Sequence, residues 1–394
     1  MTFSFSAAPG LLPAAIWIYL FFFRGAFWPI HLCDDDQTRF PAPPHFPVVV
    51  AVVPARNEAA TIGITVAALL KQDYPGPLHV VVVDDHSNDG TSQIAARAAR
   101  ESSGAARFAI HSAAAFPGGW TGKLWALNEG IRQAPRDTVS QEESAEFYWF
   151  TDADVQHAPD TLRRMVCRAQ TSQLDLTSLM VLLRARTFPE KLLIPAFVYF
   201  FLQLYPPRWI ADSQSRTAGA AGGCLLIRRQ ALQRAGGLAA IRDALIDDCA
   251  LARAVKTAGG RLSMGVTRAS VSLRDYQTFS EIRDMIARTA FTQLRYSAPL
   301  LLLTIFALFV TYLAPVALLF AGDALPRILG IISCLLMAAS FLPTVRYYRL
   351  PAAWALLLPV TAVFYAQATA LSAVRFWLGH GGQWKGRAQA PSSR

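Results

Sequence analysis

The chain has 394 residues, of which 53% are hydrophobic and 16% are charged. A soluble domain of this length is ordinarily less apolar, so we expect part of the chain to lie in lipid. The formal net charge of +10 does not indicate a nucleic-acid partner, because the basic residues are scattered and form no run interleaved with aromatic residues. Attraction to anionic lipid or to a pyrophosphate explains the positive charge.

The N-terminal segment, residues 3–23, is apolar enough to span a bilayer. Residues 1–10 contain no lysine or arginine, so the charged start of a signal peptide is missing and residues 1–24 are predicted to form an uncleaved anchor. Arg24 and a basic domain follow, so the positive-inside rule places the N-terminus outside and the domain in the cytoplasm. Residues 25–46 are interpreted as a linker.

Three further apolar segments lie near the C-terminus, at 298–320, 325–343 and 351–372. Each is close to the length that a bilayer requires, so residues 298–378 are predicted to form transmembrane segments. Three crossings from the cytoplasm would leave the basic tail, residues 379–394, outside, against the positive-inside rule. Either all three segments cross, or one of them is re-entrant or interfacial.

Between these regions, residues 47–297 have the composition of one globular domain. Residues 45–54 predict a strand and residues 59–72 a helix, and the same pair recurs at 78–83 and 91–100. Two such units in succession predict a parallel sheet with helices on both faces. Ligands of such sheets bind beyond the carboxyl ends of the strands, which directs attention to the residues that follow each strand.

Acidic residues follow two of the predicted strands. Asp152 and Asp154 come directly after an aromatic strand at 146–150. Their two carboxylates can share a divalent cation that also binds both phosphates of a nucleoside diphosphate, although aspartates in such places also serve as caps. Asp84 and Asp85 end the second strand, and they are interpreted either as part of the same cleft or as a turn before the next helix.

Five motifs carry a family resemblance. They are PARNE at 54–58, VVVDDHSNDGT at 81–91, GKLWALNEG at 122–130, TDADV at 151–155 and IDDCALA at 246–252. Together they resemble the membrane-bound family 2 glycosyltransferases, and the flanking apolar segments are similar to the branch that includes ceramide glucosyltransferase. In overall appearance the chain resembles the bacterial hopene-associated glycosyltransferase group.

The resemblance implies an α/β fold of GT-A type, with a Rossmann-like mixed, mainly parallel sheet, helices on both faces and transmembrane helices at both ends. It also implies a multi-pass protein of the bacterial inner membrane with a cytoplasmic catalytic domain. On the donor side, it implies that Ala55, Arg56 and Glu58 border the nucleotide, and that Asp84 or Asp85 lies near the base and ribose.

The resemblance further implies that Lys123 approaches the diphosphate as a cation. Asp152 would contact the nucleotide-sugar, and Asp154, with Asp152, would hold Mg2+ or Mn2+. Asp247 and Asp248 stand where the family has its acidic pair, so Asp248 would be the general base in an inverting transfer. The same two residues also precede a helical run at 249–257, where they would interact favourably with its dipole; the two roles are compatible.

Three features concern the acceptor. Gly222 and Gly223 end the stretch AGAAGG, which either lets the backbone approach a ligand closely or forms a tight turn. Residues 188–210 are apolar and aromatic, and we interpret them as an interfacial element that admits an amphipathic acceptor, with core packing as the alternative. The family's QxxRW motif is altered here: Arg295 is retained and Tyr296 replaces tryptophan, at a position expected to face the acceptor or the diphosphate.

The sequence therefore predicts a metal-dependent, inverting enzyme that transfers a single sugar from a nucleotide-sugar to a lipid at the cytoplasmic membrane face. A UDP-sugar is the expected donor, and a hopanoid is the acceptor that the resemblance suggests. Two alternatives remain: a catalytically inactive membrane scaffold with the same fold, or a polysaccharide synthase. The altered QxxRW motif argues against the synthase, because that motif holds the growing chain.

Overall fold

The computed structural model describes residues 8–33, 40–102, 104–115, 117–137, 145–379, 383–384 and 387–388. The chain divides into two compact units, which are described separately. The sheet unit comprises His31–Arg184, Trp209–Asp275 and Trp384–Arg394. The helical unit comprises Met1–Ile30, Ala185–Arg208 and Tyr276–Gln383.

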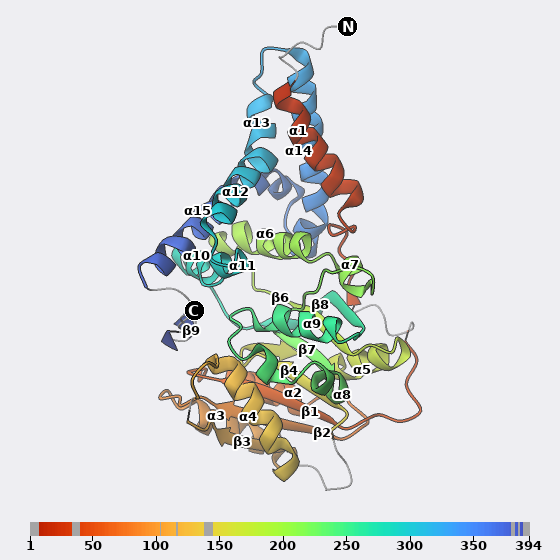
Figure 1. Ribbon diagram of the computed structural model, residues 1–394. Helices are drawn as coiled ribbons and strands as arrows, with labels where there is room; N and C mark the ends of the chain where they lie inside the picture. The colour runs from red at the N-terminus through yellow and green to blue at the C-terminus, as the bar shows by residue number, and fades with distance from the viewer. Residues whose placement is uncertain are drawn as a thin grey trace. The chain divides into compact units, whose positions relative to one another are not determined.

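The sheet unit is built on one mixed sheet, whose order in the described part of the chain is β3-β2-β1-β4-β7-β6-β8-β5 (Figure 1). The neighbours β3, β2, β1 and β4 are parallel, as are β6 and β8, whereas β7 and β5 run antiparallel to their neighbours. The strands are β1 Val49–Ala55, β2 Leu78–Asp84, β3 Phe108–Ser112, β4 Phe147–Thr151, β5 Val155–His157, β6 Leu176–Leu182, β7 Cys224–Arg228 and β8 Leu262–Ser272. The predicted mixed, mainly parallel sheet is confirmed.

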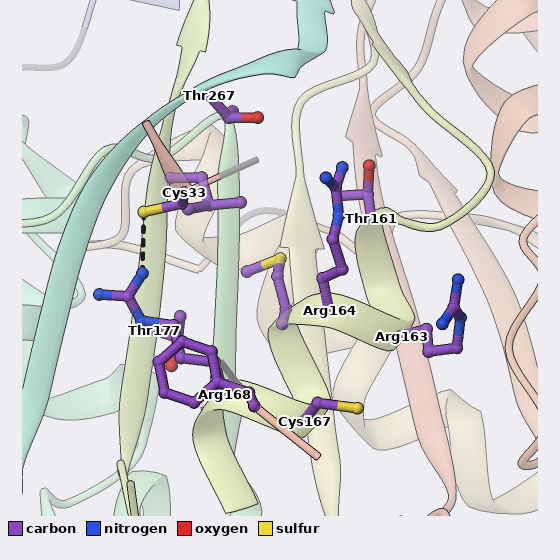
Figure 2. Close-up of a pocket in the computed structure, with 11 residues that line it drawn as sticks. Cys33, Thr161, Arg163, Arg164, Cys167, Arg168, Thr177 and Thr267 are labelled. Carbon is purple, nitrogen blue, oxygen red and sulfur yellow. Dashed lines mark hydrogen bonds between the residues drawn. The ribbon is translucent and has the colours of Figure 1, made fainter. Parts of the chain in front are cut away.

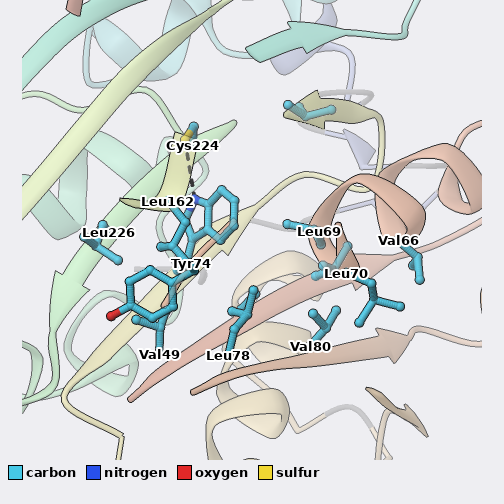
Figure 3. Packing of buried hydrophobic residues seen from close by; sticks show 14 of the residues in the cluster. Val49, Val66, Leu69, Leu70, Tyr74, Leu78, Val80, Leu162, Cys224 and Leu226 are labelled. Atoms are coloured by element: carbon cyan, nitrogen blue, oxygen red, sulfur yellow. Dashed lines mark hydrogen bonds between the residues drawn. The ribbon is translucent and has the colours of Figure 1, made fainter. Parts of the chain in front are cut away.

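Helices cover both faces of this sheet. The helices and 3-10 turns are α2 Ile62–Leu70, α3 Thr91–Glu101, η4 Ala105–Arg107, α4 Gly122–Asp137, α5 Thr161–Thr171, α8 Arg229–Arg234, η5 Leu238–Ile241 and α9 Asp247–Thr257, and α7 Pro207–Ala211 lies at the boundary of the two units. Alternate residues of β1 and β2, such as Val49 and Val80, pack with Val66 and Leu69 of α2 and Leu162 of α5 in one core (Figure 3).

The other face of the central strands is covered by α4. Gly130 of α4 lies so close to β1 and β2 that an added Cβ would collide with Val52 and come within 3.2 Å of Val83. Every residue of β1 is buried, which explains why this strand is a continuous run of β-branched and small apolar residues instead of an alternating one. The strand's carboxyl end is therefore fixed from both faces.

Two element boundaries differ from the sequence-based prediction. The helix expected at 59–72 is limited to α2, Ile62–Leu70, because Glu58 starts a turn in which its carbonyl accepts from the N–H groups of Thr61 and Ile62. The helix expected at 249–257 begins earlier, so Asp247 and Asp248 are its first two residues.

The helical unit contains three helices that are long and apolar enough to cross a membrane, counted over the described residues: Ala298–Leu318, Ala324–Tyr347 and Ala352–Trp377. The apolar helix near the N-terminus, Gly10–Phe23, is shorter, so its crossing of a membrane stays a prediction. Leu302, Phe306, Leu335 and Leu356 are each at least 60% exposed, which is costly in water and favourable in lipid. The elements are α1 Ala8–Ile18, η2 Tyr19–Phe23, α6 Phe188–Leu204, α10 Phe279–Ala287, α11 Ala290–Gln293, α12 Ala298–Leu308, η6 Phe309–Leu313, α13 Ala314–Leu318, α14 Ala324–Tyr347, η7 Ala352–Leu357 and α15 Leu358–Trp377.

The apolar segment at 188–210 forms α6 followed by α7, and the break between them lies at Tyr205 and Pro206. Within the helical unit, α6 is partly buried: the Tyr199 hydroxyl shares a 2.7 Å hydrogen bond with Ser340 of α14, and Tyr365 of α15 donates to the Leu193 carbonyl. These contacts are compatible with the alternative of core packing. Its contact with lipid stays a prediction.

A further two-stranded sheet pairs β9 Gln383–Trp384 with β10 Arg387–Ala388.

Candidate active site at the carboxyl edge of the sheet

The candidate site lies at one edge of the sheet unit. The parallel strands β1, β2 and β4 end there at Ala55, Asp84 and Thr151. Because β7 is antiparallel to β4, its first residue, Cys224, pairs with Thr151 at the same edge and brings Gly222 and Gly223 there. This arrangement explains how motifs separated by more than 150 positions meet in space.

Lys123 joins two of the predicted acidic motifs. This residue lies in the first turn of α4. Its Nζ lies 2.9 Å from Asp152 Oδ1 and 3.2 Å from Asp247 Oδ2. Burial alone would lower the pKa of Lys123, but attraction to Asp152, Asp247 and Asp248 outweighs it and raises the pKa above its ordinary value. Lys123 is therefore a permanent cation among three carboxylates.

Asp248 is held at the start of α9 by backbone groups. Its Oδ2 accepts from Gly222 N at 2.8 Å and its Oδ1 accepts from Cys249 N at 2.7 Å. Burial and repulsion from Asp247 raise the pKa of Asp248 to about 6, against the lowering effect of Lys123 and of the two hydrogen bonds. Each carboxylate oxygen keeps a second lone pair, so Asp248 can still accept a proton near neutral pH.

Gly222 occupies a position with little spare room. A Cβ added to it would lie 3.2 Å from Asp248 Oδ2 and 3.2 Å from Lys123 Nζ. Gly222 also lines a pocket together with Lys123, Asp152, Asp247 and Asp248. The glycine-rich stretch thus brings backbone directly against the acidic group, and its close approach to a ligand stays a prediction.

A second group of predicted residues lies where β1 and β2 end. Arg56 Nη1 donates to the Asp85 carbonyl at 2.6 Å and lies 3.4 Å from Asp85 Oδ2. The N–H of Glu58 donates to Thr91 Oγ1 at 2.8 Å. Ala55 is fully buried, and its carbonyl accepts from Asp85 N at 2.8 Å. These contacts join the loop after β1 to the loop after β2.

Asp84 is part of the turn between β2 and α3. Its carboxylate accepts from Ser87 N at 2.9 Å and from the Ser92 hydroxyl, so it organises the turn after β2. Asp89 also binds the start of α3, because its carboxylate accepts from the Thr91 N–H. A role for Asp84 or Asp85 in nucleotide binding remains a prediction.

Sequence reasoning missed a buried hydrogen-bonded chain behind Asp152. Thr151 Oγ1 donates to the Gly223 carbonyl at 3.0 Å, His157 Nε2 lies 2.8 Å from Thr151 Oγ1, and His157 Nδ1 lies 2.8 Å from Ser270 Oγ. Burial lowers the pKa of His157 to about 3, so its ring is neutral. The available signal was a lone histidine three positions after the acidic motif.

Comparison with known proteins identifies the family. The family profile described as "Glycosyltransferase like family 2" matches residues 44–291, well over half of the chain. The chain belongs to glycosyltransferase family 2. All the site residues described so far lie within the matched segment.

Two individual proteins are similar to this family member. Over 136 residues it is 35% identical to the beta-monoglucosyldiacylglycerol synthase of Synechocystis sp., a match that covers 34% of this chain and only 25% of that relative. The mannosyltransferase PcManGT from Pyrobaculum calidifontis, solved in complex with GDP-Man and Mn2+, aligns with a TM-score of 0.57 at 21% identity, covering 94% of this chain and 99% of that one. The second likeness supports the predicted GT-A fold.

The carboxylate side chains of this glycosyltransferase suit a hard divalent cation whose other ligands come from the substrate. In the described residues, no group of three or more His, Cys, Asp or Glu side chains could hold a metal alone. Mg2+ needs only one or two protein carboxylates when phosphates and water complete its coordination. Asp152 and Asp154 would supply two such carboxylates, and Asp154 Oδ2 lies 3.5 Å from the cationic Arg274.

Two predicted residues of this family 2 chain belong to the helical unit. Arg295 and Tyr296 both have left-handed backbone conformations, with φ of 53° and 57°. The Tyr296 ring stacks on Phe376 with centroids 4.4 Å apart, and its hydroxyl accepts from Thr292. Their role at the acceptor or the diphosphate stays a prediction.

The sheet unit has another pocket, which contains none of the predicted site residues of this glycosyltransferase (Figure 2). Arg163, Arg164 and Arg168 of α5 are among the residues that line it. Each already has a partner: Asp73 for Arg163, Asp160 for Arg164, and Cys33 for Arg168. Two of the three positive charges are therefore paired with carboxylates, and the third arginine donates to a thiol.

Proposed function

We propose that this family 2 protein transfers a single sugar from a nucleotide-sugar to a membrane lipid with inversion at the anomeric carbon. The observation that carries the proposal is the contact of Lys123 with Asp152 and Asp247, beside the half-buried Asp248. A cation for the diphosphate, a carboxylate for the donor and a base of suitable pKa are thus supplied by three separate motifs.

Charge at the site supports a metal requirement. In the described part of the chain, Lys123 pairs with Asp152 and Asp247 and attracts Asp248, and Arg274 pairs with Asp154, so these four carboxylates and two cations together carry net negative charge. A nucleoside diphosphate is also negative and would be repelled. Mg2+ or Mn2+, held by Asp152 and Asp154, would neutralise the phosphates and stabilise the leaving group.

Asp248 is the general base of the proposed transfer. Its carboxylate takes the proton of the acceptor hydroxyl while the oxygen forms a bond to the anomeric carbon. The bond from that carbon to the phosphate oxygen breaks, and its electron pair leaves with the nucleoside diphosphate. Direct displacement of this kind inverts the configuration. Lys123 lies beside Asp152, where it would attract the charge that develops on the leaving phosphate.

A lipid acceptor is supported by two observations. Among the described residues, the helical unit has three helices long enough to span a bilayer, and the relative from Synechocystis sp. is by name a beta-monoglucosyldiacylglycerol synthase. We propose that the sheet unit works at the cytoplasmic face of the bacterial inner membrane, as the positive-inside rule suggests. A hopanoid is the acceptor suggested by the sequence resemblance, and diacylglycerol is the acceptor suggested by the curated relative.

The proposal is tested by release of nucleoside diphosphate from UDP- and GDP-sugars by the full chain in lipid, with Mn2+ or Mg2+ and either a hopanoid or diacylglycerol. We expect one donor to turn over, and we expect a chelator or Asp154→Ala to abolish the turnover. Asp160→Ala, which removes an aspartate of α5's start that pairs with Arg164, is the matched control and should remain active. If no donor binds or turns over with any lipid, the inactive scaffold replaces this proposal.

A further inference from the structure

A buried serine outside the motifs holds the backbone beside the proposed base. Ser178 lies on β6 and is fully buried. Its hydroxyl oxygen accepts from Ala221 N at 2.7 Å, and the hydroxyl donates to the Ala221 carbonyl at 3.1 Å. One side chain therefore satisfies both backbone groups of the residue that precedes Gly222.

The N–H and C=O of Ala221 depend on the Ser178 hydroxyl because Ala221 lies outside the regular sheet. Strand β7 begins at Cys224, and the pairing of β6 with β7 places Ser178 opposite Leu225. Ala221 is only 6% exposed, so water reaches its N–H and C=O poorly. Buried backbone groups without a ladder partner require a side chain or an ordered water.

The residue on the other side of Gly222 is held in the same manner. Thr151 at the end of β4 donates its single hydroxyl proton to the Gly223 carbonyl. His157 must then donate from Nε2 to Thr151, and Nδ1, which carries no proton in this tautomer, accepts from Ser270. Side chains of two strands thus fix the backbone on both sides of Gly222.

We propose that Ser178 is a positioning residue for the transfer reaction: by fixing Ala221, it holds the Gly222 N–H against Asp248 and so sets the direction of the proposed base. The inference rests on the proposed function. Gly222 has little room to move, because a Cβ added to it would lie only 3.2 Å from both Asp248 and Lys123.

The substitution Ser178→Ala removes both hydrogen bonds and leaves almost the same volume. Because the Ala221 backbone groups lose their partner, Gly222 shifts and Asp248 loses its orientation. A displacement of about 1 Å at a reacting group lowers turnover by up to roughly 100-fold, so we expect kcat to fall by about 10- to 100-fold. The KM for the donor should change by less than about threefold, because both hydrogen bonds of Ser178 go to Ala221, which is not a predicted donor-binding residue.

Thr177→Val is the matched control. Thr177 is the adjacent residue on β6, is 1% exposed, and its side chain points to the opposite face of the sheet. Its hydroxyl has no hydrogen-bond partner among the residues that the structure describes, so its loss should not alter kcat. A fall in kcat for Thr177→Val equal to that for Ser178→Ala would overturn the proposal, since it would indicate general damage to β6.

A double variant tests the route of action. Gly222→Ala displaces Asp248 directly, so adding Ser178→Ala to it should cost little more than Gly222→Ala alone. If the two losses in kcat multiply instead, Ser178 acts elsewhere and the proposal is wrong. Should Ser178→Ala unfold the protein, Ser178→Cys, which keeps a weak donor and acceptor, is measured in its place with the same comparison.

The experiment uses the full chain in lipid, with the donor and lipid that the wild-type protein turns over. A loss of kcat at near-constant KM, confined to Ser178→Ala and absent from Thr177→Val, supports the inference. Wild-type turnover together with normal kcat for Ser178→Ala overturns the inference and leaves the proposed function in place. Absence of wild-type turnover with every donor overturns both.

Discussion

The pH dependence of turnover is expected to depend on Asp247. Burial is the first cause of the raised pKa of Asp248, about 6, and repulsion from Asp247 is the second. The substitution Asp247→Asn removes the repelling charge and also frees Lys123, whose Nζ lies 3.2 Å from Asp247 Oδ2, to attract Asp248 more strongly. Both changes favour the carboxylate, so the pKa of Asp248 should fall.

The size of this change is limited by the structure. The pKa of Asp248 rises from 3.8 to about 6, and burial, the larger cause, is unchanged when asparagine replaces an aspartate of the same shape. Asp247 is therefore the smaller of the two effects that raise this pKa, and we expect its removal to lower the pKa by on the order of 1. Because the base works as a carboxylate, kcat/KM is lost as pH falls through this pKa, and the variant should keep more of its plateau rate at about pH 5.5.

The assay is kcat/KM for nucleoside diphosphate release between about pH 5 and pH 8, with each profile normalised to its own plateau. Asp243→Asn is the matched control, because Asp243 is exposed in the loop before α9 and its substitution removes the same charge. An acid limb for Asp247→Asn that stays at the wild-type position, or moves to higher pH, would refute the role of Asp247 in setting the base.

Two other substitutions have defined outcomes. Lys123→Met leaves three carboxylates without their cation, so kcat/KM should fall by roughly 100- to 1,000-fold and its acid limb should move to higher pH, whereas exposed Lys71→Met should behave as wild type. His157, buried and neutral with a pKa of about 3, takes up a proton far more readily when unfolded. As pH falls below about 6.5, this histidine should therefore lower the stability of the wild-type protein by about 1.4 kcal/mol per pH unit. In His157→Gln, the slope of stability against pH should be smaller by that amount. Melting temperatures in detergent at several pH values measure it, and equal slopes for the two proteins would contradict the assignment.

Much of the sheet unit could be predicted because its central strands are simple. The runs that became β1 and β2 are apolar and β-branched, and each ends in polar residues before a helix, a pattern that predicts parallel strands and a site at their carboxyl ends. Asp152 and Asp248 were recognised from their motifs. Their meeting at Lys123 follows only once the order of strands is known.

The remaining features depend on tertiary contacts that leave no local pattern. The short apolar strand β7 is equally compatible with parallel and antiparallel pairing, and its antiparallel placement is what brings Gly222 to the edge. Ser178 is an ordinary residue within a strand, and its importance lies in a contact 43 positions away. His157 likewise acts through a partner 113 positions away, Ser270.

The central claim is that the carboxyl edge of the sheet transfers a sugar to a lipid. Its most direct test is mass spectrometry of the lipids. The full chain in lipid is incubated with the donor and a divalent cation, and the Asp248→Asn variant is treated in the same way. We predict that wild-type protein adds the mass of one sugar residue to a lipid and that Asp248→Asn, with its fold intact, adds none. A product with several sugars, or equal product from Asp248→Asn, would contradict the account.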